Sequence, residues 1–130
     1  MIVVDASTAL EVLLQTSAAA SVEARLFRRA QTLHVPHLID LEIAQVLRRY
    51  ASTKQIDQRR CQEALQDWLA FPVSRYAHDT LLPRVWELRN NLTAYDASYI
   101  ALAEALDAPL ATRDTRLANA SGHTAKIELL

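Results

Sequence analysis

The chain has 130 residues, 51% of them hydrophobic, and a formal net charge of −1. This length predicts one domain with a substantial buried core, and the balanced charge by itself favours neither a nucleic-acid nor a membrane partner. The single glycine argues against P-loop NTPases, dinucleotide-binding enzymes and G-x-S-x-G hydrolases, because all three need glycines in the loops that form their sites.

Cysteine content and apolar runs set the expected compartment. Cys61 is the only cysteine, which rules out an intramolecular disulfide and a cysteine metal cage. The N-terminal residues lack the basic segment and apolar core of a signal peptide, and no apolar run approaches the ~20 residues of a membrane span. We expect a cytoplasmic protein with no membrane partner.

Short apolar runs alternate with stretches of helical periodicity along the whole chain. Such alternation predicts a parallel sheet with helices on both faces. Thr8 and Glu11 have capping-box spacing at the start of the first helix, and Asp57 and Thr93 are expected to cap later helices. The expected strands are 2–4, 33–35, 73–76, 109–112 and 126–129, and the expected helices are one after residue 5, then 18–30, 37–52, 57–71, 79–90, 93–106 and 115–120.

Four acidic residues stand where predicted strands give way to helices, or just inside a helix. Asp5 closes the first strand, and Asp114 follows the fourth by two residues. Asp96 lies at the start of the helix that leads into the fourth strand, and Glu42 lies within the third helix. Ligands bind outside the carboxyl ends of the strands of such sheets, so these acids can converge. Carboxylates without a nucleophile or a Cys/His set indicate a hard divalent cation.

Each acid also has an ordinary structural role open to it. Asp5 and Asp114 are good helix N-caps, and Asp96 has the position of a capping-box acid. Glu42 and Asp40 lie on opposite margins of one apolar stripe, so helical periodicity cannot choose between them. A shared site explains three acids at one edge of a sheet better than three separate caps do.

Four stretches around these acids form an ordered pattern over nearly the whole chain. They are Val3-Val4-Asp5-Ala6-Ser7, Glu42 followed by Val46-Leu47-Arg48-Arg49, Asp96-Ala97-Ser98-Tyr99-Ile100-Ala101-Leu102-Ala103, and Leu110-Ala111-Thr112-Arg113-Asp114. In this order and spacing they resemble the PIN-domain family, and more narrowly its VapC-type toxin ribonucleases. Each stretch alone is a weak signal, whereas the ordered set is specific.

The resemblance implies a three-layer α/β/α sandwich with a short, mostly parallel sheet, formed by a single PIN domain over residues 1–130. It implies a Mg²⁺- or Mn²⁺-dependent endoribonuclease, the toxin of a type II toxin–antitoxin pair. The expected substrate is tRNA or ribosomal RNA, and the expected partners are a VapB-type antitoxin and a second copy of the chain. The resemblance selects Glu42 over Asp40. It places Asp5, Glu42, Asp96 and Asp114 in the catalytic site, the metal mainly on Asp5, Asp96 and Asp114, and Thr112 and Ser7 in support.

Arginine is the dominant base, with 12 residues against 2 lysines. If the four acids form one site, eleven others remain against 14 basic residues, so the rest of the surface is mildly basic. Arginine suits bidentate contact with phosphate. Arg113 and Arg116 flank Asp114 and are the first candidates for RNA contacts, with Arg48 and Arg49 next. A solvated basic face is the alternative for each.

Rival functions differ in how well the residues fit them. A haloacid-type phosphatase would want an acid two residues after Asp5, where Ser7 stands. A phosphoryl-receiver domain would want an acceptor Asp closing a middle strand, and none follows the strand at 33–35. Two alternatives stay open: a catalytically silent binding module on a PIN scaffold, and a nuclease directed at DNA.

Overall fold

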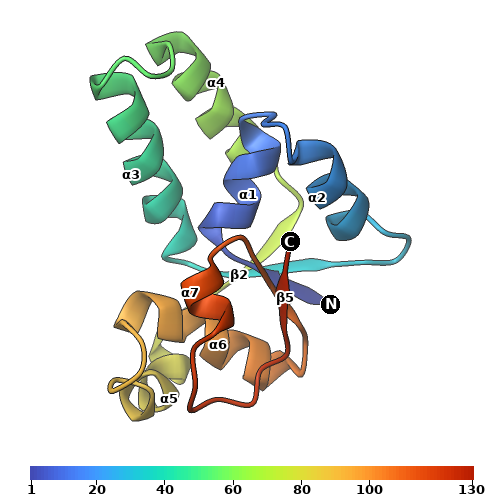
Figure 1. The fold of residues 1–130 in the computed structure, drawn as a ribbon, viewed down its shortest axis with the longest axis vertical. Coiled ribbons are helices and arrows are strands. Elements are labelled where there is room, and N and C mark those ends of the chain that lie inside the picture. The colour runs from blue at the N-terminus through green and yellow to red at the C-terminus, as the bar shows by residue number, and fades with distance from the viewer.

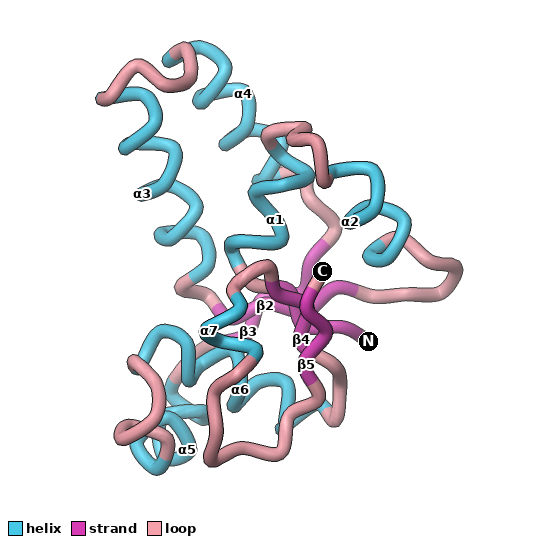
Figure 2. Tube along the Cα trace, in the orientation of Figure 1, coloured by secondary structure: helices cyan, strands magenta, loops and turns pink.

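Five short strands form a fully parallel sheet at the centre of the protein (Figure 2). The computed structural model describes all residues from Met1 to Leu130. The strand order is β3-β2-β1-β4-β5, and the pairing of β1 with β4 aligns Val3 with Leu110. The strands are β1 (Ile2–Val4), β2 (Leu33–Pro36), β3 (Val73–Tyr76), β4 (Leu110–Thr112) and β5 (Ile127–Leu129).

Helices cover both faces of the sheet, as the sequence predicts for an α/β/α sandwich (Figure 1). On one face lie α1 (Ala6–Leu13), α2 (Ala19–Leu26), α3 (Ile39–Ser52) and α4 (Gln58–Leu69), and α3 and α4 extend beyond the sheet as a pair. On the other face lie α5 (Leu82–Glu87), which follows a 3₁₀ turn (Asp79–Leu81), and α6 (Ala94–Leu106). The short α7 (Thr115–Ala118) follows β4. No helix has both the length and the apolar character needed to span a bilayer.

The predicted strands are all present, and the predicted helices differ mainly in their ends. The first helix is capped by Asp5, not by the expected Thr8 box, because the Asp5 carboxylate accepts a hydrogen bond from Thr8 N–H at 2.9 Å. Thr8 lies inside α1, where its hydroxyl donates to Ala111 O at 3.1 Å. The helix expected over 18–30 ends at Leu26, and the one expected over 79–90 is a 3₁₀ turn followed by α5. Asp57 and Thr93 cap as predicted.

The order of the strands fixes where a ligand can bind. The chain builds β1, β2 and β3 outward in one direction and then adds β4 and β5 on the opposite side of β1. Neighbouring crossovers therefore leave β1 and β4 toward opposite sides, which opens a crevice at their carboxyl ends. Asp5 follows β1, and Thr112 ends β4, so both lie at this crevice.

Candidate active site

Asp5 is a buried carboxylate at the crevice, only 5% exposed. Its Oδ1 accepts hydrogen bonds from Ser7 Oγ at 2.7 Å and from Thr8 N–H at 2.9 Å. Its Oδ2 accepts from Thr112 Oγ1 at 2.5 Å. Burial raises the pKa of Asp5, and these hydrogen bonds oppose that rise. The side chain is thus fixed in place by donors from both sides of the crevice, including the predicted supporting residues Ser7 and Thr112.

Thr112 joins Asp5 to Asp114. Its Oγ1, which donates to Asp5, also accepts from Asp114 N–H at 3.0 Å. The Asp114 carboxylate caps α7, since its Oδ1 accepts from Arg116 N–H at 2.9 Å. Its Oδ2 lies 3.9 Å from the Arg116 guanidinium. The capping role considered for Asp114 is therefore present in the structure, and it occupies one of the two carboxylate oxygens.

The structure distinguishes Glu42 from Asp40. Glu42 faces the crevice, where Tyr99 Oη donates to its Oε1 at 2.5 Å. Burial raises the pKa of Glu42, and the charges of Asp96 and Asp5 raise it further. The Asp40 carboxylate instead binds residues of α4 and β3: it accepts from Trp68 Nε1 at 2.6 Å and forms an ion pair with Arg75 at 3.1 Å.

Asp96 completes the group from the start of α6. Its backbone N–H donates to Thr93 Oγ1 at 3.2 Å, so it lies in the first turn with a half-buried carboxylate. Burial raises the pKa of Asp96, the charges of Asp114 and Asp5 raise it further, and Arg116 opposes the rise. The four acids are therefore close enough to influence one another electrostatically.

These acids are grouped without forming a closed cage. No three acidic, histidine or cysteine side chains stand in positions that would already hold a metal ion. The chemistry of the donors nevertheless fits a hard divalent cation, because all are carboxylate oxygens and the pKa values of Asp5, Glu42 and Asp96 are raised by burial. A cation among them would offset both the burial and the mutual repulsion.

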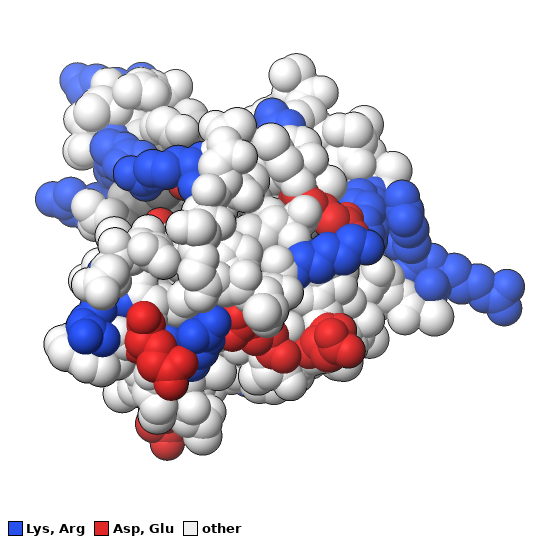
Figure 3. Space-filling model, turned by 60° about the horizontal axis from the view of Figure 1, so that its bottom comes forward, with Lys and Arg blue, Asp and Glu red and all other residues white.

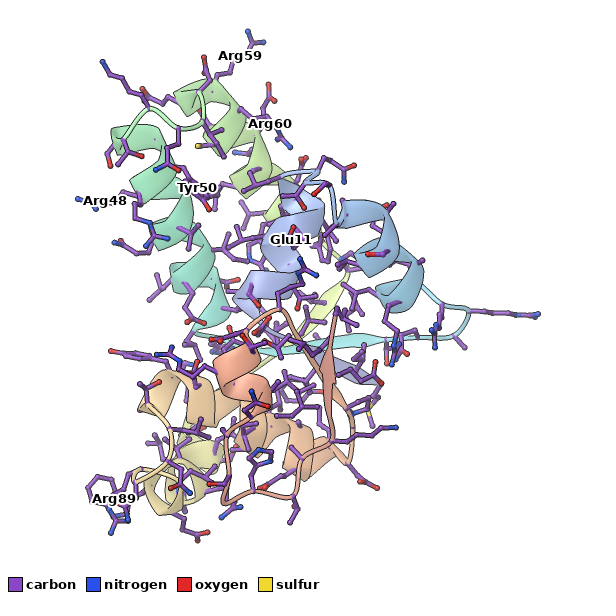
Figure 4. The ribbon with its side chains drawn as sticks, in the orientation of Figure 1. Glu11, Arg48, Tyr50, Arg59, Arg60 and Arg89 are labelled. Carbon is purple, nitrogen blue, oxygen red and sulfur yellow. The ribbon has the colours of Figure 1, made fainter.

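Of the arginines that flank Asp114, only Arg116 is free to bind a ligand. The Arg113 guanidinium donates to Leu130 O at 2.5 Å and lies 3.6 Å from Glu11. Arg116 has a side chain that is 85% exposed. Arg48 points outward from α3, well away from the crevice (Figure 4), whereas Arg49 is exposed and lines a groove beside it.

Two hollows reach the acids from different sides. One, which we call the apolar groove, has a volume of about 650 Å³ and lies between α1, α3 and the start of α6. It reaches Ser7 and Glu42, and its lining includes the exposed side chains of Leu41 and Tyr95. The other, which we call the polar cleft, has a volume of about 840 Å³ and lies between the loop that follows α5 and the segment from α7 to residue 121. It reaches Asp96 and Arg116.

Sequence reasoning missed Tyr99 as a residue of the site. The signal was present, because Tyr99 stands three residues after Asp96 and such residues share one face of a helix. Burial raises the pKa of Tyr99, so its hydroxyl stays protonated and can donate to Glu42. Sequence reasoning also missed the polar cleft, because the cleft depends on contacts between loops that are distant in sequence.

Comparisons with known proteins identify the family and the fold of the chain. The PIN domain family model matches residues 2–122. VapC ribonuclease Mb0985 of Mycobacterium bovis is 50% identical over 119 residues, which cover 92% of this chain and 90% of that protein. Ribonuclease VapC12 of Mycobacterium tuberculosis is 39% identical over 130 residues, 100% of this chain and 99% of that protein. Among solved structures, VapBC2 of Rickettsia felis, bound to a DNA fragment from its promoter, has a similar fold, with a TM-score of 0.72 and 14% identity over 99% of this chain and 98% of that one.

Proposed function

The chain belongs to the PIN-domain family and to its VapC ribonucleases, and from this premise we propose that it is a metal-dependent endoribonuclease, the toxin of a type II toxin–antitoxin pair. The observation that carries the proposal is the convergence of four carboxylates, Asp5, Glu42, Asp96 and Asp114, at the switch point of the sheet. The proposed substrate is structured RNA, either tRNA or ribosomal RNA, and its cleavage by the protein would inhibit translation. A single PIN domain over residues 1–130 carries the activity.

The proposed metal ligands are Asp5, Asp96 and Asp114, with Mg²⁺ as the ion and Mn²⁺ as a substitute. A bound divalent cation lowers the pKa of a coordinated water and neutralises charge on the phosphate. Ser7 and Thr112 keep Asp5 oriented toward the crevice through their hydroxyl groups. In this orientation Asp5 Oδ1 also caps α1 by accepting from Thr8 N–H.

Glu42 is the proposed proton acceptor for the attacking water. Burial and the neighbouring carboxylates raise the pKa of Glu42, which brings it nearer to the value that suits a general base. Tyr99 holds Oε1, so the other carboxylate oxygen is available to the water. As the water oxygen attacks phosphorus, one proton of the water passes to Glu42, the P–O bond to the leaving ribose oxygen breaks, and that oxygen takes up a proton from solvent. Arg116, beside Asp114 and Asp96, offsets negative charge on the RNA.

The apolar groove supports an antitoxin as the protein partner. Leu41 is 76% exposed and Tyr95 is 67% exposed at the edge of a groove that ends at Glu42. Exposed apolar side chains around a concave surface mark protein interaction sites. An antitoxin segment in this groove would block the acids, and a second copy of the chain is the other proposed partner. The proposed location is the cytoplasm, where the proposed RNA substrate is found.

Incubation of purified protein with total RNA tests the function. We expect discrete cleavage with Mg²⁺ or Mn²⁺, none with excess chelator, and none for Asp96→Asn. Sequencing the new RNA ends identifies the site of cleavage. A parallel digestion of single- and double-stranded DNA tests the alternative of a DNA-directed nuclease. Absence of any metal-dependent cleavage would favour the silent binding module.

A further inference from the structure

The polar cleft has two walls of different origin. One wall is the loop after α5, which contributes Arg89, Asn90 and Asn91, and the other is the segment from α7 to residue 121, which contributes Arg116 and Asn119. Asp96 lies on the lining of the same cleft, which therefore opens directly onto the candidate active site. Its volume of about 840 Å³ falls within the ~300–1,000 Å³ typical of ligand pockets.

We propose that the polar cleft binds the RNA strand on one side of the scissile phosphate. Arg116 contacts the phosphate nearest the acids, and Arg89 contacts a phosphate farther along the strand. Asn90 and Asn119 face the nucleotide between them. This inference rests on the proposed ribonuclease function and adds to it the path of the substrate.

The two arginines are available for phosphate in different ways. Arg116 has a side chain that is 85% exposed, and its nearest acidic contact, with Asp114, is a loose one of 3.9 Å. The Arg89 guanidinium lies 4.6 Å from the centre of the Trp86 ring, and its Nη1 donates to Trp86 O at 2.9 Å, which holds the group in place while its other N–H groups remain available to donate. Figure 4 shows Arg89 at the end of the molecule opposite Arg59. Cations along one cleft favour a polyanion over a neutral ligand.

The amide side chains that lie between Arg89 and Arg116 in the cleft are suited to binding single-stranded RNA. Asn90 and Asn119 are exposed, and an amide side chain can both donate to and accept from a base edge or a ribose hydroxyl. Unpaired RNA offers such edges, whereas the bases of a duplex are largely hidden. Seven of the twelve residues that line the apolar groove are hydrophobic, against three of eleven in the polar cleft, so the apolar groove fits a protein segment better. Figure 3 shows one face of the molecule, where several acidic side chains gather along the lower edge with a basic side chain among them, and further basic side chains lie toward both ends.

The cleft is held in shape by a contact between its walls. Asn91 Nδ2 donates to Ser121 O at 3.0 Å, and Arg84 donates to Gly122 O at 3.2 Å. Gly122, the only glycine, has a φ of +89°, and a Cβ there would overlap the Asn91 amide. Arg84 is itself fixed by a bidentate pair with Glu104 at 2.7 and 3.0 Å. The walls are therefore joined before any ligand binds.

Binding of a labelled RNA tests the inference separately from cleavage. The probe is a fluorescein-labelled single-stranded RNA of 12 nucleotides and mixed sequence, bound to the uncleaving Asp5→Asn protein and followed by anisotropy. Adding Arg116→Gln should weaken binding at least about fivefold and lower the slope of log affinity against log salt by ~0.7, the value for one phosphate contact on a single strand. Arg116→Lys should restore most of the slope.

Arg59→Gln is the matched control, because Arg59 is an 89% exposed arginine at the start of α4, far from the cleft. It should change affinity less than twofold. Equal losses for Arg59→Gln and Arg116→Gln would overturn the cleft as the strand path, and so would unchanged RNA affinity of Arg116→Gln, which would leave the cleft to a protein partner. Failure of the unmutated protein to cleave total RNA with Mn²⁺ would instead overturn the ribonuclease function itself, and the inference with it.

Discussion

Asp5 and Thr112, 107 residues apart in sequence, share a hydrogen bond of 2.5 Å across the crevice between β1 and β4. The same Thr112 hydroxyl accepts the backbone N–H of Asp114 at 3.0 Å. One hydroxyl therefore sets the orientation of one acid and the backbone position of another. This relationship makes Thr112 a positioning residue whose removal should affect both fold and activity.

Thr112→Val removes this hydroxyl with little change in volume. We expect a loss of stability of about 1–3 kcal/mol, because the Asp114 N–H is left without its partner in a partly buried place and Asp5 Oδ2 loses its donor. Activity should fall about 10–100-fold, the range for residues that orient metal ligands. The pKa of Asp5 should rise further, since the Thr112 hydrogen bond lowers it. Denaturant unfolding and cleavage rates against pH measure these effects.

Thr115→Val is the control for that experiment, because Thr115 is an exposed threonine three residues later. It should leave activity within about twofold and stability within ~0.5 kcal/mol, as is usual for surface substitutions. Equal effects of the two variants would show that Thr112 acts only through local helix or strand preference.

Asp5→Asn should abolish cleavage while leaving the metal-free fold equally or more stable. Burial raises the pKa of Asp5, so its charged form is disfavoured in the fold. The stability linked to such a group is present below its unfolded value of 3.8 and is lost as pH rises through the raised value. The asparagine carbonyl can still accept from Thr8 N–H. Thermal melting in excess chelator at pH 7 measures this, and a clear drop in Tm would show that the carboxylate is needed as a cap.

Glu42→Gln and Asp40→Asn form a matched pair on one helix. Glu42→Gln should remove activity, because a neutral amide cannot accept the proton of the attacking water, and Tm should stay nearly unchanged. Asp40→Asn should keep activity and lose about 1 kcal/mol, since its pair with Arg75 is partly exposed to solvent. Cleavage rates and melting curves separate the two effects. Loss of activity in Asp40→Asn together with full activity in Glu42→Gln would place Asp40, not Glu42, in the site.

Most of the fold could be predicted from the amino-acid sequence, which also singled out the four acids that the structure brings near one another. Alternating apolar runs predicted every strand, and the acids that follow β1 and β4 lie at the same edge of the sheet because those strands are parallel neighbours. Helical periodicity could not separate Glu42 from Asp40, because the choice depends on Trp68 and Arg75, which reach Asp40 from α4 and β3. Family resemblance made that choice.

The ends of the helices and the polar cleft could not be predicted from sequence patterns, because they also depend on tertiary contacts. Asp5 and Thr8 both suit an N-cap, and only the position of Thr8 beneath Ala111 O decides between them. The walls of the cleft meet through Asn91 and Ser121, two polar residues 30 positions apart with no local signal of their pairing. Tertiary contacts of this kind override local preference.

Glu104→Gln should destabilise the protein at neutral pH and have little effect in acid. Arg84 and the N–H of Thr124 hydrogen-bond the Glu104 carboxylate and lower its pKa to about 2, from 4.5 when unfolded. The linked stability is therefore present above pH 4.5 and is lost as pH falls toward 2. Denaturant unfolding at pH 7, 5 and 3 should show the gap between the two proteins narrowing below pH 4.5. Glu87→Gln, which alters an exposed pair with the same arginine, serves as the control.

Gly122→Ala should destabilise the protein by more than the ~1–2 kcal/mol that a left-handed conformation costs a residue with a Cβ, because the new methyl group also overlaps the Asn91 amide. The new methyl group also pushes Asn91 off Ser121 O, so the two walls of the polar cleft separate and affinity for the 12-nucleotide RNA falls. In an Asn91→Ala background the clash is absent and only the backbone cost remains, so Gly122→Ala should cost less there than in the unmutated protein. Denaturant unfolding of the four proteins of this double-mutant cycle gives the coupling between the two residues. A coupling free energy near zero would mean that Gly122 is needed only for the conformation of its own turn and not for the contact between Asn91 and Ser121 that joins the walls.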